Sequence, residues 1–267
     1  VFIGIAKGAN RESTEFVSIY DVDNSSGIII LCILLILAVI IIGRLKGLSS
    51  LIALAITIAL LFIIFIPATL KGYSPMVIAV IISVLSVIIT MPVIAGFNMK
   101  TLAAILGASG GIIFASLLAL STGLIMHLSG IITNEMLTVF YIADVTIDLK
   151  GLVLSGMIIA ALGAIMDVCI SIASSTREVI RANPNISEKE AFKSSLRVGT
   201  DILGSMVNTL ILAYVGSSLP MLLIISFKYH KGMSFWMVLN YNPVLTEIVK
   251  SIIGSIGMFI SIPLTAY

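Results

Sequence analysis

The sequence is dominated by apolar stretches long enough to cross a lipid bilayer. The first runs from Gly27 to Gly43 without a charged residue. About 20 apolar residues in helical conformation span the hydrocarbon core of a bilayer. Of the 267 residues, 59% are hydrophobic and 10% are charged, whereas a soluble domain has about 25% charged residues. The sequence therefore predicts an all-α polytopic membrane protein.

We expect about seven membrane-spanning helices in one bundle over residues 27–267. Prolines and glycines, such as Pro67, Pro75 and Pro243, mark the ends of the apolar stretches. Between the fourth and fifth spans, a short interfacial helix is predicted at 135–141. The predicted spans are 27–43, 48–66, 75–94, 101–124, 151–176, 201–227 and from 244 onward.

Residues 1–26 differ in character from the rest. Val1–Ile5 and Glu15–Tyr20 have the composition of short β-strands on either side of a polar turn. Two strands cannot form a core of their own. We interpret residues 1–26 as the tail of a small β-rich domain whose beginning lies outside this sequence.

Lysine and arginine are more frequent in the loops that are cytoplasmic when the N-terminus of this chain is outside. The densest group follows the fifth span, between Arg177 and Arg197. In the same segment, Ser187 and Glu190 form a capping box that predicts an amphipathic helix at about 187–198. This helix either joins two spans along the surface or docks a partner as a coupling helix.

A carboxylate lies deep inside the fifth span. Asp167 precedes Arg177 by about ten residues, or about 15 Å of helix, which is close to the middle of a bilayer. A charged side chain at that depth is costly and marks a functional site by default. Asp167 is therefore the centre of the predicted site.

Helical spacing places further polar residues on two faces. On the fifth span, Ser171 and Ser174 share a helix face with Asp167. On the sixth span, Asp201 and Asn208 share a face. We predict that Asp167 faces Asn208 and that Arg197 pairs with Asp201 at the cytoplasmic rim. The alternative is that these side chains only form hydrogen bonds between helices, each of which stabilises the helix packing by about 0.6 kcal/mol. The candidate ion, substrate or proton-relay residues are Asp167, Ser171, Ser174, Asp201, Ser205 and Asn208.

Small residues predict close helix packing. Gly107 and Gly111 form a GxxxG pair in the fourth span, which we expect to approach the fifth and sixth. Gly163 and Gly204 are predicted packing positions on the fifth and sixth spans. A Gly-Ser-Ser-Leu-Pro sequence at 216–220 predicts a kink.

Other functional classes lack their signatures. Cys32 and Cys169 lie in apolar segments, and His127 and His230 have no metal-ligand spacing around them. There is no phosphate-binding loop and no nucleic-acid signature. We expect no cofactor, no metal, no nucleic-acid partner and no enzymatic activity.

Several motifs of the spans resemble the YibE/F-like family. They are ALGAIMDV at 161–168, SIASS at 171–175, NP at 183–184, GTDILGSM at 199–206 and NTLILAYVG at 208–216. The resemblance implies a multi-spanning protein of the bacterial cytoplasmic membrane. It also implies an extracytoplasmic β-domain ahead of the helices, often with an N-terminal anchor, which would account for the strands at 1–26. It implies no settled biochemical activity.

Three functional hypotheses follow. The first is a transporter or permease for a small solute, a proton or a monovalent cation, centred on Asp167. The second is a non-catalytic component of a membrane assembly or of the envelope-stress response, with the lipid bilayer and a homo-oligomer or another membrane protein as partners. The third, a remote one, is an intramembrane aspartyl protease with Asp167 and Asp201 as its dyad, which requires the two carboxylates to lie within a few ångströms.

Overall fold

The structure is a computed structural model that describes residues 2–6, 16–21, 24–128, 130, 136 and 147–267. The chain divides into two compact units, residues 1–51 and 52–267. The interfacial helix predicted at 135–141 lies outside the described residues except for Met136.

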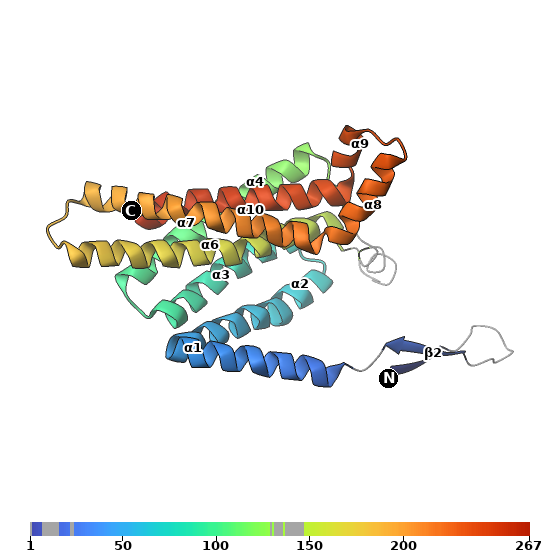
Figure 1. Cartoon of the computed structure of the whole chain (residues 1–267), viewed down its shortest axis with the longest axis horizontal. Coiled ribbons are helices and arrows are strands. Elements are labelled where there is room, and N and C mark those ends of the chain that lie inside the picture. The colour runs from blue at the N-terminus through green and yellow to red at the C-terminus, as the bar shows by residue number, and fades with distance from the viewer. Residues whose placement is uncertain (1, 7–15, 22–23, 129, 131–135, 137–146) are drawn as a thin grey trace. The chain divides into compact units, whose positions relative to one another are not determined.

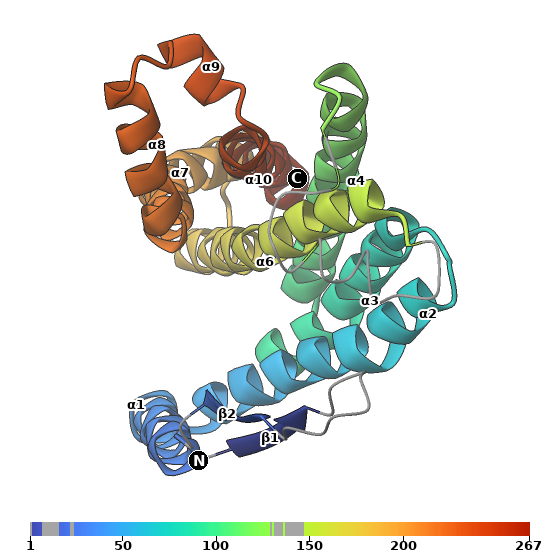
Figure 2. The same ribbon diagram turned by 90° about the vertical axis from the view of Figure 1, so that its right-hand side faces the viewer.

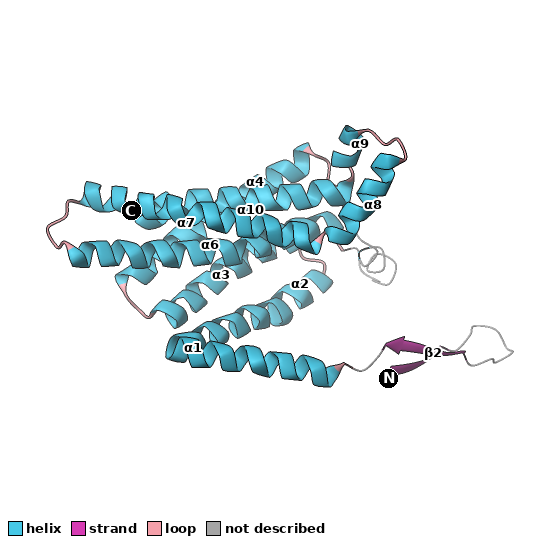
Figure 3. Ribbon diagram, in the orientation of Figure 1, coloured by secondary structure: helices cyan, strands magenta, loops and turns pink. Residues whose placement is uncertain are grey.

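The first unit begins with a β-hairpin. Strand β1 (Phe2–Ala6) pairs antiparallel with β2 (Phe16–Asp21), and Ile5 lies opposite Val17. Figure 3 shows the two strands in magenta, the only strands among the described residues. Their bounds lie within one residue of the predicted ones. The β-domain to which they would belong remains a prediction.

A long apolar helical stretch crosses from the first unit into the second. It consists of α1 (Ser25–Leu60), the π-helical segment η1 (Leu61–Phe65) and α2 (Ile66–Leu70). Its 46 residues correspond to about 70 Å of helix, more than twice the hydrocarbon core of a bilayer. Arg44 interrupts it with φ 49° and ψ −132°, which is not a helical conformation.

The interruption at Arg44 falls between the predicted spans 27–43 and 48–66. Among the described residues, six helices are long and apolar enough to cross a membrane, with residues 25–70 counted once. Dividing this stretch at Arg44 would make seven. The count of seven spans therefore remains a prediction, whereas a bundle of several membrane-length helices is established.

The second unit is a bundle of long helices that lie side by side in Figure 1. After α2 its helices are α3 (Pro75–Ala95), α4 (Met99–Ile125), α6 (Leu149–Ala182), α7 (Glu188–Ser217), α8 (Leu219–His230), α9 (Phe235–Leu239) and α10 (Asn242–Ala266). The short helices α8 and α9 connect α7 to α10. Helix α6 packs against α3, α4, α7 and α10, and Figure 2 shows it between α3 on one side and α7 and α10 on the other.

Small residues let α4 and α10 approach closely. Gly107 lies against Thr265, and Gly111 lies against Ser261 and Gly257, so that a Cβ on either glycine of α4 would collide with α10. The GxxxG pair of the fourth predicted span thus packs mainly on the last helix. Helix α4 also packs against α6, the fifth predicted span, and a Cβ on Gly111 would lie 3.2 Å from Ile165 of that helix.

The segment predicted as a separate amphipathic helix at 187–198 is instead continuous with the following span. Ser187 caps α7 by accepting a hydrogen bond from the Glu190 N–H at 3.3 Å, as the capping box predicts. No break follows: the chain stays helical through Gly199, which is buried against Ile172 and Ile262.

The same helix ends earlier than the predicted limit of residue 227. The break falls at Ser218, inside the Gly-Ser-Ser-Leu-Pro sequence, and α8 begins at Leu219 with Pro220 in its first turn. Proline suits the first turn of a helix, where its missing N–H leaves no carbonyl without a partner.

Candidate functional site

Asp167 lies on the face of α6 that the bundle leaves uncovered. Ile158, Ile165 and Ile172 form the buried face of this helix. Asp167 follows Ile165 by two residues, or about 200° around the helix, and its side chain is exposed. Within the described part of the chain it makes no hydrogen bond and no ion pair. The predicted central carboxylate therefore has no partner inside its own bundle.

Small and hydroxylated residues share this face of α6. Gly156 and Gly163 are exposed, and a Cβ added to either would meet no atom of the described residues within 4 Å. Ser171 and Ser174 are half-buried beyond Asp167. We refer to Gly156, Gly163, Asp167, Ser171 and Ser174 as the α6 outer face.

Among the described residues, nothing packs closely on Gly163 or Gly204, the predicted packing positions of the fifth and sixth spans. No described atom lies within 4 Å of a Cβ added to Gly204 on α7, as for Gly163. The close approach between α6 and α7 occurs on other faces, where Gly199 touches Ile172.

Two contacts set the register between the antiparallel helices α6 and α7. A hydrogen bond of 2.7 Å joins Thr176 Oγ1 to Ser195 Oγ. Ile172, four residues before Thr176, lies against Gly199, four residues after Ser195. Continuing the same register places Asp167 level with Gly204.

Leu210 and Ala161 confirm this register, because both contact Gly254 of α10. Asp201 then lies three residues from the level of Asp167 on one side, and Asn208 lies four residues away on the other. Each offset is about one helical turn, 4.5 to 6 Å. Asp167 and Asn208 are thus similar in depth, as predicted.

The α7 side chains nevertheless point away from the bundle. Asp201, Ser205 and Asn208 are exposed, while Gly199 and Leu203 on the opposite face of α7 are buried. We refer to Asp201, Ser205 and Asn208, together with the exposed Arg197, as the α7 outer face.

The predicted partnerships of these residues do not form in the single chain. No hydrogen bond joins Asp167 to Asn208, and Arg197 makes no ion pair with Asp201, in the part of the chain that the structure describes. Ser205 Oγ donates to the Ile202 carbonyl of its own helix at 2.8 Å. The physical reason is the same on both helices: the apolar face packs, and the polar face is left outside.

The protease dyad is also absent from this arrangement. Asp167 and Asp201 are separated by three residues along the helix axis, and no hydrogen bond joins their carboxylates. Two aspartates that share a proton must lie within hydrogen-bonding distance. No group of three or more His, Cys, Asp or Glu residues that could hold a metal ion occurs among the described residues.

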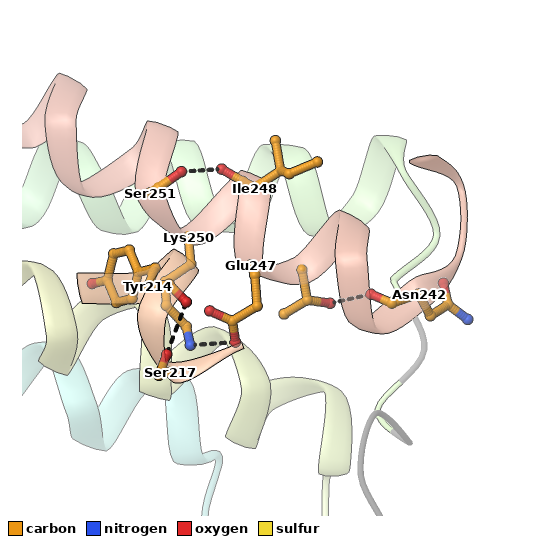
Figure 4. A network of polar contacts seen from close by, with 8 residues as sticks. Tyr214, Ser217, Asn242, Glu247, Ile248, Lys250 and Ser251 are labelled. Carbon is orange, nitrogen blue, oxygen red and sulfur yellow. Dashed lines mark hydrogen bonds and ion pairs between the residues drawn. The ribbon is translucent and has the colours of Figure 1, made fainter. Parts of the chain in front are cut away.

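A second ionic group, which the sequence analysis did not single out, lies between α10 and α7. Lys250 Nζ lies 2.8 Å from Glu247 Oε1. Figure 4 shows this pair with Tyr214 of α7 beside it. The Lys250 ammonium lies 5.2 Å from the centre of the Tyr214 ring, within the range of a cation–π interaction. Both charged side chains are mostly buried, and Glu247 Oε2 has no hydrogen-bond partner. The signal in the sequence was the i, i+3 spacing of opposite charges inside an apolar helix.

The Thr176–Ser195 hydrogen bond was missed for a related reason. Both residues lie on the packed faces of their helices, whereas the polar stripe that contains Asp167 lies on the outer face. The turn Asn183-Pro184-Asn185 lies about midway between them in the sequence. Residues at equal distances from the turn between two antiparallel helices lie at the same level. The spacing from this turn could therefore have predicted the pairing of Thr176 with Ser195.

Comparison with known proteins identifies the family and no individual relative. No curated protein and no solved structure matches the chain. The family model described as YibE/F-like protein matches residues 31–267, which include every membrane-length helix of the second unit. The chain is a multi-pass membrane protein, and it belongs to the YibE/F-like family.

Proposed function

We propose that this protein is a transporter or permease for a small solute or ion, and that its translocation site is formed by the α6 and α7 outer faces. The supporting observation is that Asp201 and Asn208 each lie within about a turn of Asp167 in depth, on adjacent membrane-length helices, and that all three lack partners in the described part of the chain. Ionisable groups inside membrane spans typically belong to ion pathways or proton relays.

The polar side chains of the two outer faces require contact with protein or water instead of lipid. A carboxylate at the centre of a lipid-exposed helix costs about 2.5–3.5 kcal/mol on insertion scales. Small residues such as Gly156 and Gly163 allow a neighbouring helix to approach closely. We therefore propose that a second copy of the chain covers the two outer faces.

Charge favours a second copy as the cover. Arg197 and Asp201 are one turn apart on the α7 outer face, carry opposite charges, and have no partner among the residues that the structure describes. In two parallel α7 helices related by a two-fold axis, each residue lies level with its own copy, and Arg197 of one copy reaches Asp201 of the other diagonally, about one turn along the axis. These two diagonal pairs are the charge contacts that a second copy offers this face.

In this proposal Asp167 carries the proton or binds the monovalent cation. Asn208, Ser171, Ser174 and Ser205 supply oxygen ligands or a proton relay, and Asp201 acts as a gate toward the cytoplasm. We place the protein in the bacterial cytoplasmic membrane with the N-terminus of this chain outside, on the basis of its lysine and arginine distribution.

The test is flux through proteoliposomes. Proton and monovalent-cation fluxes are measured for the parent, for Asp167→Asn and for the control Glu178→Gln. Glu178 is an exposed carboxylate on the same helix, but it is paired with Arg181 at 3.2 Å near the helix end. Transport predicts flux in the parent and in the control and none in folded Asp167→Asn. Equal flux in all three variants contradicts the assignment of Asp167.

A second candidate function rests on the same exposed faces. A non-catalytic assembly component would use them only to bind another membrane protein or another copy. It predicts that the parent moves no ion, while Gly163→Leu abolishes association in the membrane. Flux in the parent excludes this second candidate.

A further inference from the structure

A cavity opens where the start of α4 meets the ends of α6 and α10. Its volume is about 680 Å³, within the usual range for sites that bind small molecules. Three basic side chains line it: Lys100 from α4, and Arg177 and Arg181 from α6. It lies apart from the outer faces described above, none of whose residues lines it.

Two of these three cations are not neutralised. Arg181 pairs with Glu178 at 3.2 Å. Lys100 and Arg177 are half-buried, and neither has an ion pair in the described part of the chain. Two like charges held beside one cavity repel each other. An anion bound between them would remove that repulsion.

The rest of the lining is suited to an anion that carries an apolar group. The cavity includes the N-terminal end of the 27-residue helix α4, capped by Asn98, and the positive end of a helix dipole favours negative charge. Apolar side chains adjoin the cations, among them Met99, Ala173 and Ile180. A purely polar anion would leave these side chains without a partner.

We propose that this cavity binds a phosphate group, carried either by an anionic phospholipid or by a soluble phosphorylated molecule. Arginine and lysine bind phosphate through charge-assisted hydrogen bonds. Basic pockets between membrane helices on the cytoplasmic side bind anionic headgroups, and Lys100, Arg177 and Arg181 all lie on the cytoplasmic side in the predicted orientation. The proposal does not depend on transport, since it uses none of the same residues.

The experiment measures ligand binding to the purified full chain in a neutral detergent by native mass spectrometry and thermal stability. The probes are phosphatidylglycerol, phosphatidylcholine as the zwitterionic comparison, and glycerol 3-phosphate as the soluble comparison. The variants are Lys100→Gln and Arg177→Gln. The matched control is Lys193→Gln, an exposed cation of α7 outside the cavity.

Each cavity variant is expected to weaken phosphatidylglycerol binding about fivefold, the effect of one basic residue near an anionic headgroup. The control should bind as the parent does, and Arg177→Lys should retain most of the affinity. The site is assigned to a soluble ligand if glycerol 3-phosphate binds saturably, if this binding depends on Lys100 and Arg177 in the same way, and if the lipid does not bind. The proposal is overturned if neither probe binds, if phosphatidylcholine binds as tightly as phosphatidylglycerol, or if Lys193→Gln loses as much affinity as the cavity variants.

Discussion

Replacing Gly111 by alanine tests the close packing of α4 on α10. An added Cβ would lie 2.8 Å from the Cβ of Ser261 and 3.0 Å from the carbonyl oxygen of Gly257. Both distances are shorter than carbon contacts normally allow. The carbonyl is backbone and cannot rotate away, so the two helices must move apart.

The magnitude follows from two opposing effects. Overpacking a well-packed interface costs about 1–3 kcal/mol. Exchanging glycine for alanine inside a helix recovers about 0.5–1 kcal/mol of conformational entropy. We expect Gly111→Ala to lower the free energy of unfolding by about 1–2 kcal/mol.

Gly163→Ala is the matched control, since it makes the same chemical change in a helix with nothing within 4 Å of the new methyl group. It should leave the free energy of unfolding unchanged or raise it by up to about 1 kcal/mol. The assay is unfolding of the detergent-solubilised monomer in sodium dodecyl sulfate, followed by circular dichroism. Equal stability of the two variants would refute the proposed crossing of α4 and α10 at Gly111.

Three further predictions follow from the described contacts. Gly163→Leu should reduce association between copies in liposomes, measured by energy transfer between labelled chains, with unchanged unfolding of the monomer; unchanged association contradicts the proposed interface. Lys250→Met should lower the free energy of unfolding of the bundle by about 1–3 kcal/mol, because it leaves Glu247 charged and unpaired among mostly buried groups. Adding Glu247→Gln should restore most of that stability. A double variant as unstable as the single one contradicts this account. Ser195→Ala should cost about 0.6–1.7 kcal/mol through loss of its hydrogen bond to Thr176, and Thr176→Val in the same background should add little, which a double-mutant cycle measures.

The membrane-spanning character of the chain could be predicted from its sequence because it depends on the length and composition of each stretch. Local signals also placed the hairpin near residues 2–21 and the helix cap at Ser187. The break near Pro220 was predictable as well, since proline imposes its conformation wherever it stands. These features need no knowledge of neighbouring helices.

The contacts between helices depend on which face of each helix packs, and composition does not decide this in a membrane span. Both faces of α6 are mostly apolar, so a polar stripe at helical spacing is compatible with an inward or an outward direction. Helical spacing predicted that Asp167 faces Asn208 inside the bundle. Packing instead buries the isoleucines at 158, 165 and 172 and leaves Asp167 on the outer face.

The sequence by itself thus determined that this is a bundle of membrane helices, which residues form those helices, and that Asp167 lies deep within one of them. Only the tertiary structure decided that Asp167 and Asp201 lie outside the bundle, that Gly107 and Gly111 pack on α10, and that Lys250 pairs with Glu247 beside Tyr214. The physical reason is that hydropathy acts along the chain, residue by residue. The rotation of a helix about its axis is set by the shapes of the side chains that must fit against its neighbours.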